Sequence, residues 1–109
     1  MTEKAGAIRV YIDPNLMNLL PTYLKRRNDD VVLLRTSIRL QDFDSIQRIA
    51  HKLYGNGSMF GFDAISKMGK SLETAAMEKD ILKIQEHTQA LFEYLANIEI
   101  CPGENNGNT

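Results

Sequence analysis

Four aspartates divide the sequence into segments of helical length, and this spacing limits the possible folds more than any other feature. Each stands at the start of a segment that carries apolar residues at helical spacing. An aspartate in this position can accept hydrogen bonds from the free N–H groups of the first helical turn. The four are Asp13, Asp42, Asp63 and Asp80. They predict a chain built mainly of helices with short connections.

Further breaks in the pattern set the ends of the expected helices. Pro21 should kink or divide the first helix, because proline lacks the N–H group that a helix interior needs. The polar residues 28–30 should end that helix and cap the next one, and Cys101-Pro102-Gly103 should end the last. We therefore expect helices over residues 14–27, 31–40, 43–58, 64–79 and 81–100.

Helices joined by such short connections pack as antiparallel neighbours. We predict an all-α fold, an antiparallel four-helix bundle with an additional N-terminal helix. The domain should span residues 8–100, with flexible termini at 1–7 and 101–109. Within residues 8–12, apolar and polar side chains alternate, which predicts a short extended segment. No second segment of this kind is visible, so we expect it to pack on the domain without forming a sheet.

Charge and composition exclude several classes of function. The net charge of the 109 residues is −1, so nothing in it favours binding to nucleic acid or to an anionic membrane. No segment is apolar for long enough to be a signal peptide or a membrane span. The single Cys101 can form no internal disulfide and suits a reducing compartment. We expect a monomer in the cytoplasm.

The segment 43–58 places a histidine on the exposed side of an amphipathic helix. At about 100° per residue, an apolar stripe lies within roughly 60° of Ile46. It contains Ile46, Ile49, Ala50, Leu53, Gly57 and Phe60. His51 lies about 140° from Ile46, so its side chain should point to solvent. Gly55 follows one turn later on nearly the same line of the helix.

The glycines near His51 admit two interpretations. Gly55 can leave the turn beside the imidazole bare, so that another molecule's backbone can approach, and Gly57 can let a neighbouring helix pack closely. Alternatively, these glycines and Gly61 only end the helix and form a turn, with His51 a solvated surface residue. The spacing alone leaves both interpretations open.

The spacing resembles the motif of the histidine-containing phosphotransfer (HPt) domain family. That motif has a histidine, a glycine four residues later, a small residue at seven and a glycine at ten. This sequence has His51, Gly55, Ser58 and Gly61 at those offsets. The similarity includes the stretches "DPNLMNLLPTYLKRR" and "GFDAISKMGKSLETAA" and covers residues 8–98. It implies a four-helix bundle with an extra N-terminal helix, and His51 as the phosphoryl-accepting residue.

By this resemblance, the chain is a phosphorelay intermediate that exchanges a phosphoryl group with the receiver domain of a response regulator or hybrid histidine kinase. The sequence contains no phosphate-binding glycine loop and no acidic cluster suited to Mg²⁺. We therefore expect a covalent carrier rather than an enzyme, with no cofactor, metal or ATP site of its own; the Mg²⁺ belongs to the receiver. The alternative is a helical docking module that binds a signalling partner without phosphoryl transfer.

One position departs from the family pattern. Many members carry lysine three residues after the histidine, where this chain has Tyr54. A cation there would neutralise phosphoryl charge and help to dock an acidic receiver. Arg48 and Lys52 are the available substitutes, unless both are only solvated surface charges. The expected phosphoryl-stabilising or docking residues are thus Arg48, Lys52, Tyr54, Gly55 and Ser58, and the expected docking rim is Gln47, Met59 and Phe62, although Phe62 could instead close the bundle.

Other residues with suitable chemistry are expected to have structural roles. His87 lies at the flank of an apolar stripe with no glycine beside it, so we interpret it as a surface or boundary residue. Met68 and Met77 should fill the core. Cys101 has no base beside it in the sequence and is a poor candidate for a nucleophile.

Overall fold

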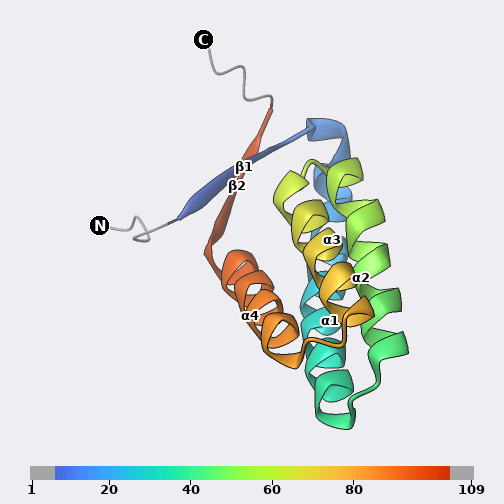
Figure 1. Ribbon diagram of the computed structural model, residues 1–109. Coiled ribbons are helices and arrows are strands. Elements are labelled where there is room, and N and C mark those ends of the chain that lie inside the picture. The colour runs from blue at the N-terminus through green and yellow to red at the C-terminus, as the bar shows by residue number, and fades with distance from the viewer. Residues whose placement is uncertain (1–6, 104–109) are drawn as a thin grey trace.

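The computed structural model describes residues 7–103, so most of the expected flexible termini, residues 1–6 of 1–7 and 104–109 of 101–109, lies outside the described residues. In chain order the elements are strand β1 (Ile8–Ile12), 3-10 helix η1 (Pro14–Leu19), helices α1 (Leu20–Leu40) and α2 (Phe43–Gly57), 3-10 helix η2 (Ser58–Phe60), helices α3 (Asp63–Met77) and α4 (Ile81–Asn97), and strand β2 (Ile98–Pro102). The chain is mostly helical, as expected for an all-α fold. Figure 1 shows the long helices side by side and the two strands at one end.

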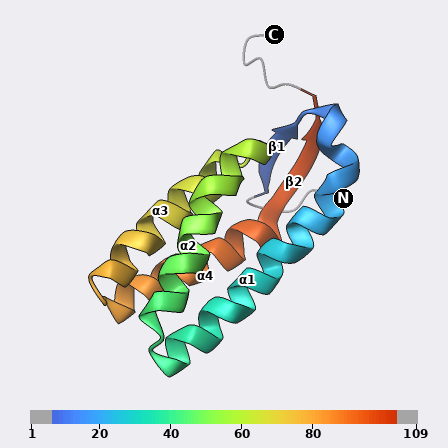
Figure 2. The same cartoon turned by 90° about the vertical axis from the view of Figure 1, so that its right-hand side faces the viewer.

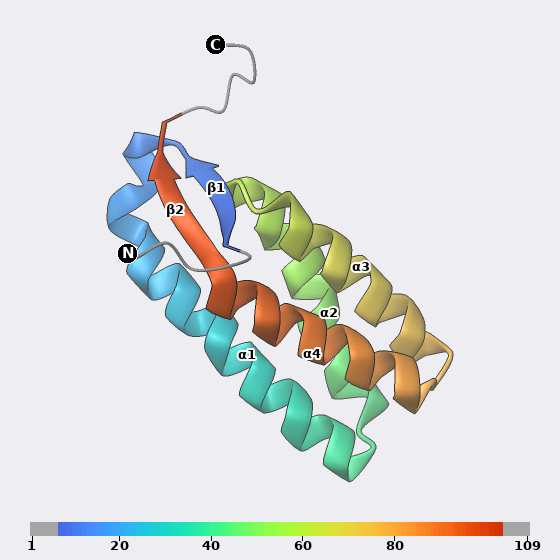
Figure 3. The same ribbon diagram turned by 90° about the vertical axis from the view of Figure 1, so that its left-hand side faces the viewer.

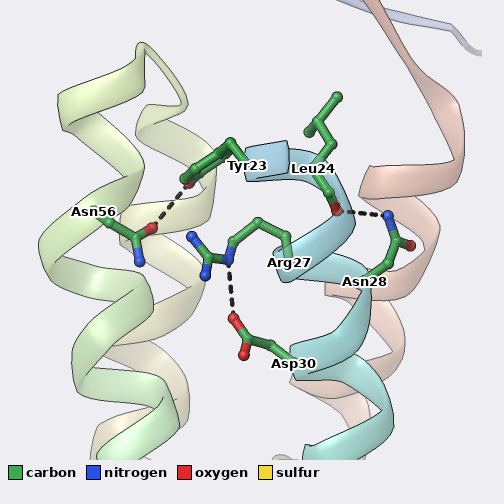
Figure 4. A network of polar contacts seen from close by, with 6 residues as sticks. All are labelled: Tyr23, Leu24, Arg27, Asn28, Asp30 and Asn56. Carbon is green, nitrogen blue, oxygen red and sulfur yellow. Dashed lines mark hydrogen bonds and ion pairs between the residues drawn. The ribbon is translucent and has the colours of Figure 1, made fainter. Parts of the chain in front are cut away.

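The predicted division of the first helical region into two helices is wrong. Only the short η1 precedes α1, which continues through the polar residues 28–30. Their side chains bind groups of the same helix and therefore do not cap a new one. Asn28 Nδ2 donates to the carbonyl of Leu24 at 2.9 Å, as Figure 4 shows. Asp29 pairs with Lys25 one turn earlier, with 3.2 Å between Oδ2 and Nζ.

Pro21 also has a different role from the expected kink. It lies in the first turn of α1, where backbone N–H groups have no partner within the helix. A missing N–H therefore costs nothing there, and the fixed backbone angle of proline suits the start of the helix. The break expected at Pro21 is in fact the change from η1 to α1.

The two ends of the described chain pair as a small parallel sheet, which the sequence reading did not foresee. Ile8 is opposite Ile98, and the register continues to Ile12 opposite Pro102. The N–H of Gly103 then donates to the carbonyl of Ile12 at 2.9 Å. The partner strand occupies residues that were expected to extend the last helix or to belong to a flexible terminus. Figure 3 shows β2 continuing from α4 and running beside β1.

The last helix ends earlier than predicted because its backbone changes direction at Asn97. The Asn97 side chain donates to the carbonyl of Glu93 at 2.7 Å, and Ile98 is already extended, with φ −76° and ψ 148°. Ile98 and Ile100 continue the apolar pattern of α4, but β-branched residues also suit a strand. Both are partly buried against the core, in which Val10 of β1 is buried and Ile12 of β1 is fully buried.

Two glycines allow α2 and α3 to approach each other closely. A Cβ at Gly57 would lie 2.5 Å from Ser66 N and 2.7 Å from Phe62 O. A Cβ at Gly69 would lie 2.4 Å from Tyr54 N. Real side chains do not come so close to backbone, so any larger residue would push the helices apart. The expected role of Gly57 in close helix packing is confirmed, and Gly69 is a second residue of this kind. Figure 2 shows the two helices along their length.

Three of the four aspartates cap their helices as expected. Asp13 accepts from Asn15 N, Asp42 from Ser45 N, and Asp80 from Lys83 N. Asp63 instead forms the first turn of α3, whose N-cap residue is Phe62. The cap at α2 has a second hydrogen bond, because the Asp42 carboxylate also accepts from the Ser45 hydroxyl at 2.6 Å.

The Asp42 cap should make stability depend on pH. Hydrogen bonds from the Ser45 hydroxyl and N–H lower the pKa of the Asp42 carboxyl from its ordinary value of 3.8. Its contribution is therefore present above pH 3.8 and lost as the pH falls through the lower pKa of the folded state. We expect Asp42→Asn, which keeps a capping oxygen but no charge, to have a lower Tm than wild type at pH 7 and the same Tm in acid. Thermal unfolding across this range measures the difference; a difference independent of pH would contradict the assignment.

Candidate functional site

His51 lies in the middle of α2 on the side away from the core. Its side chain is 69% exposed, whereas Ile46, Ala50 and Leu53 are fully buried. The expected projection of the imidazole to solvent is confirmed, and so is the apolar stripe that the helical angles predicted. The histidine is thus held by a stable helix and is open to a partner.

Glu73 of α3 holds one nitrogen of this imidazole. Its Oε2 is 3.0 Å from His51 Nδ1, and its side chain is only 17% exposed. An ionised carboxylate can only accept a hydrogen bond, so Nδ1 carries the proton. In the neutral ring, Nε2 is then the nitrogen with a free lone pair. The contact assigns the tautomer and leaves the distal nitrogen available for chemistry.

Glu73 is not among the residues predicted from the sequence, because it lies 22 positions after His51 on another helix. The contact between Glu73 and His51 depends on the close approach of α2 and α3. Gly69 lies one turn before Glu73 on the same face of α3, and its missing side chain lets that face reach α2. In the sequence, this contact was indicated only by Gly69 and Glu73, a glycine and an acid four residues apart on the helix that follows the histidine.

Gly55 leaves an open space next to His51. A Cβ added there would meet nothing within 4 Å. This differs from the crowded Gly57 and Gly69, so packing within the chain does not require glycine at position 55. Glycine also lowers helix stability by about 1 kcal/mol relative to alanine. The interpretation that the position is kept bare for another molecule is therefore favoured over a purely structural role.

A bulky side chain at position 55 should hinder a partner without damaging the fold. We expect Gly55→Gln to retain the helical circular dichroism and Tm of wild type or slightly exceed them, because glutamine is the better helix former. By the family resemblance noted from the sequence, it should slow phosphoryl exchange with a receiver domain, because the side chain fills the open turn beside the imidazole. Unchanged exchange by this variant would show that no partner approaches over Gly55.

Arg48 and Lys52 lie on the side of His51 that faces α1. Together with Leu33 and Ser37 of α1, they line a groove of about 650 Å³ that includes His51. Gln47 lines the same groove. Arg48 Nη2 donates to the Ser45 hydroxyl at 3.2 Å. The structure thus brings Gln47, Arg48 and Lys52 together beside the histidine.

The residues expected at the end of the motif have mixed outcomes. Ser58 donates from its N–H to Ser66 Oγ at 2.8 Å, and the Ser66 hydroxyl donates to the carbonyl of Tyr54. Ser58 therefore links η2 to α3 in the structure. Met59 is 72% exposed and remains available to a partner. Phe62 is fully buried, so its prediction as part of a docking rim is wrong, and it closes the bundle instead.

A polar network fixes α1 against α2 near the same end (Figure 4). The Tyr23 hydroxyl donates to Asn56 Oδ1 at 2.9 Å, and Arg27 Nε pairs with Asp30 Oδ2 at 2.9 Å. The Arg27 guanidinium also lies 4.6 Å from the centre of the Tyr23 ring. Burial raises the pKa of Asp30, and the charges of Arg27 and Lys52 oppose this rise. The Tyr23–Asn56 hydrogen bond is the contact of this network that joins α1 to α2.

The remaining candidates have no comparable surroundings. His87 is half-buried at the boundary, as expected, and Met68 packs against the core. Met77 is 64% exposed, so its prediction as a core residue is wrong.

Residues 7–103 contain no group of three His, Cys, Asp or Glu side chains that could hold a metal ion. In the same range, no helix is both long and apolar enough to cross a membrane.

The fold and the site together define a class of protein: a helical module that presents one exposed histidine whose inner nitrogen is held by an acid. The family model of the Hpt domain matches residues 18–99, and the chain belongs to this family. Hpt domains are phosphotransfer histidine modules of two-component signalling that interact with receiver domains and act as phosphocarriers rather than enzymes. Comparison with curated proteins and with solved structures gave no match.

Proposed function

We propose that this protein is a phosphorelay intermediate that accepts and donates a phosphoryl group on Nε2 of His51. Its partner is the aspartate of a receiver domain, in a response regulator or a hybrid histidine kinase. The observation that carries the proposal is the contact of His51 Nδ1 with Glu73 at 3.0 Å, on a side chain that is otherwise open to solvent. This arrangement directs the free lone pair of the ring outward.

The transfer requires no proton to leave the imidazole. The Nε2 lone pair attacks phosphorus, the N–P bond forms, and the bond from phosphorus to the aspartyl oxygen breaks. The aspartate leaves as a carboxylate with the electron pair of that bond. The ring keeps its proton on Nδ1 and becomes positively charged, and the Glu73 carboxylate faces this charge. A carboxylate that orients and stabilises an imidazolium acts in the same way in serine protease triads.

The surroundings of His51 fit an acidic partner. Gly55 leaves room for the partner's backbone, and Arg48 and Lys52 place positive charge in a groove that the acids Asp44 and Glu73 also line. The receiver supplies the Mg²⁺ and the acidic residues, so the carrier needs no cofactor, ATP site or autokinase activity of its own. The proposal places it in the cytoplasm as a monomer. The helices α1–α4 serve as an antiparallel four-helix scaffold for the site.

Chemical loading of the purified chain tests the proposal. Phosphoramidate donates its phosphoryl group directly to histidine, with ammonia as the leaving group. We expect one phosphate per chain, labile in acid and stable in base, and its transfer to a receiver domain when Mg²⁺ is added. Failure to load, or acid-stable phosphate, would contradict the proposal. A receiver that binds the chain tightly without any loading would favour a docking module that does not transfer phosphate.

A further inference from the structure

The side of His51 that faces α3 differs from the side that faces α1. Three residues after His51 stands Tyr54, 46% exposed, with its ring centre 6.4 Å from that of the imidazole. A phosphoryl group on Nε2 would bring a charge near −2 and three oxygens that accept hydrogen bonds. Tyr54 offers no positive charge to that group. Arg48 and Lys52 line the groove that His51 shares with residues of α1 and with Glu73 of α3, whereas Tyr54 does not line it.

Lys70 of α3 brings a positive charge to the Tyr54 side. Its Nζ lies 5.2 Å from the centre of the Tyr54 ring, within the range of a cation–π interaction. Lys70 precedes Glu73 by three residues, so both project from neighbouring positions of α3 toward the α2 face that carries His51 and Tyr54. The same helix therefore presents a carboxylate to the inner nitrogen of the imidazole and a cation to the neighbouring ring of Tyr54.

The charge of Lys70 is not used elsewhere in the described part of the chain. Among residues 7–103, its ammonium forms no ion pair, and the side chain is exposed. By contrast, Lys25 pairs with Asp29 on its own helix, and Lys83 pairs with Asp80, the N-cap residue of its helix. The lysine side chain is long and flexible, so its ammonium can change position while the helix backbone stays in place. Tyr54 lies beside both groups, with its ring centre 5.2 Å from Lys70 Nζ and 6.4 Å from the centre of the imidazole. The cation–π contact over the ring face uses no acceptor atom, so the N–H groups of the ammonium that point away from the ring can still donate.

We propose that Lys70, held by the ring of Tyr54, supplies the cation that binds the phosphoryl group on His51. In this chain the positive charge thus comes from α3, rather than from the position three residues after the histidine. The lysine donates to phosphoryl oxygens as the N–P bond forms and as it breaks, and no proton or bond of the lysine is consumed. The inference rests on the proposed function of His51.

Loading with phosphoramidate tests this role without the need for a partner. We compare wild type with Lys70→Ala, with Lys70→Arg, and with Lys83→Ala as a matched loss of one lysine on α4. Lys70→Ala should load about fivefold more slowly at low salt, and the deficit should shrink as salt screens the charge. Lys70→Arg and Lys83→Ala should load as wild type does. All variants should keep the Tm of wild type, because each altered side chain is exposed.

A second substitution distinguishes charge from other effects of the change. Adding Tyr54→Lys to Lys70→Ala returns a cation to α2, and it should restore the loading rate. Equal rates for Lys70→Ala and wild type at low salt would overturn the role of Lys70 while leaving the phosphorylation of His51 established. No rescue by Tyr54→Lys, or a deficit independent of salt, would also overturn it. Absence of phosphate on wild type would instead refute the proposed function itself.

Discussion

Replacing His51 with glutamine should abolish phosphoryl acceptance while leaving the fold intact. The glutamine side chain has no nucleophilic nitrogen, but its amide can still donate to the Glu73 carboxylate. Because the position is 69% exposed, the free energy of unfolding should stay within about 0.5 kcal/mol of wild type. Loading with phosphoramidate and urea denaturation measure the two quantities on the same preparation.

His87→Gln is the matched control for this experiment, because His87 is the other histidine of the chain. It lies at the boundary of α4 with no acid bound to its ring among the described residues. The control variant should accept phosphate at the wild-type rate. Phosphate retained by His51→Gln and lost by His87→Gln would move the site to α4. A large fall in Tm for His51→Gln would mean that His51 supports the fold.

Replacing Gly69 with alanine should cause the largest loss of stability among small substitutions in α3. The added methyl carbon would lie 2.4 Å from Tyr54 N, 2.8 Å from Ala50 O and 2.9 Å from Leu53 Cβ. Two of these atoms belong to the backbone of α2, so the helices must separate to admit it. Overpacking of this kind costs about 1–3 kcal/mol, more than the gain from the better helix propensity of alanine. Urea denaturation measures the change.

Gly55→Ala is the matched control for Gly69→Ala. It adds the same methyl group to a helix of the same pair, at a position where nothing lies within 4 Å. We expect it to be neutral or to stabilise the chain by up to about 1 kcal/mol. Equal effects of the two substitutions would show that α2 and α3 are not in the close contact described.

The substitution Gly69→Ala should lower the rate of phosphate loading as well as the stability. Glu73 lies one turn after Gly69 on the same face, so helices that move apart would take its carboxylate away from His51. The imidazole would then lose the hydrogen bond that keeps the proton on Nδ1. Gly69→Ala should therefore load phosphate more slowly than Gly55→Ala at a temperature where both remain folded.

The sequence by itself determined the features that depend on neighbours along one helix. The angles of α2 were enough to place His51 in solvent and Ile46, Ala50 and Leu53 in the core. Caps such as Asp42 were readable because their partners lie within one turn. Residues 28–30 show the limit of such reading, since the same polar side chains can cap a helix or bind groups within one, and the local pattern does not distinguish these cases.

The tertiary structure decided which distant residues meet. The strand Ile8–Ile12 found its partner at Ile98–Pro102, across nearly the whole described chain. Glu73 meets His51, and Lys70 meets the ring of Tyr54, because Gly69 lets α3 approach α2. Phe62 follows the motif directly, yet the turn between η2 and α3 buries it completely. Periodicity reports which side of a helix is apolar, but the partner of each side chain depends on the distance and rotation between helices, which packing of the whole chain sets.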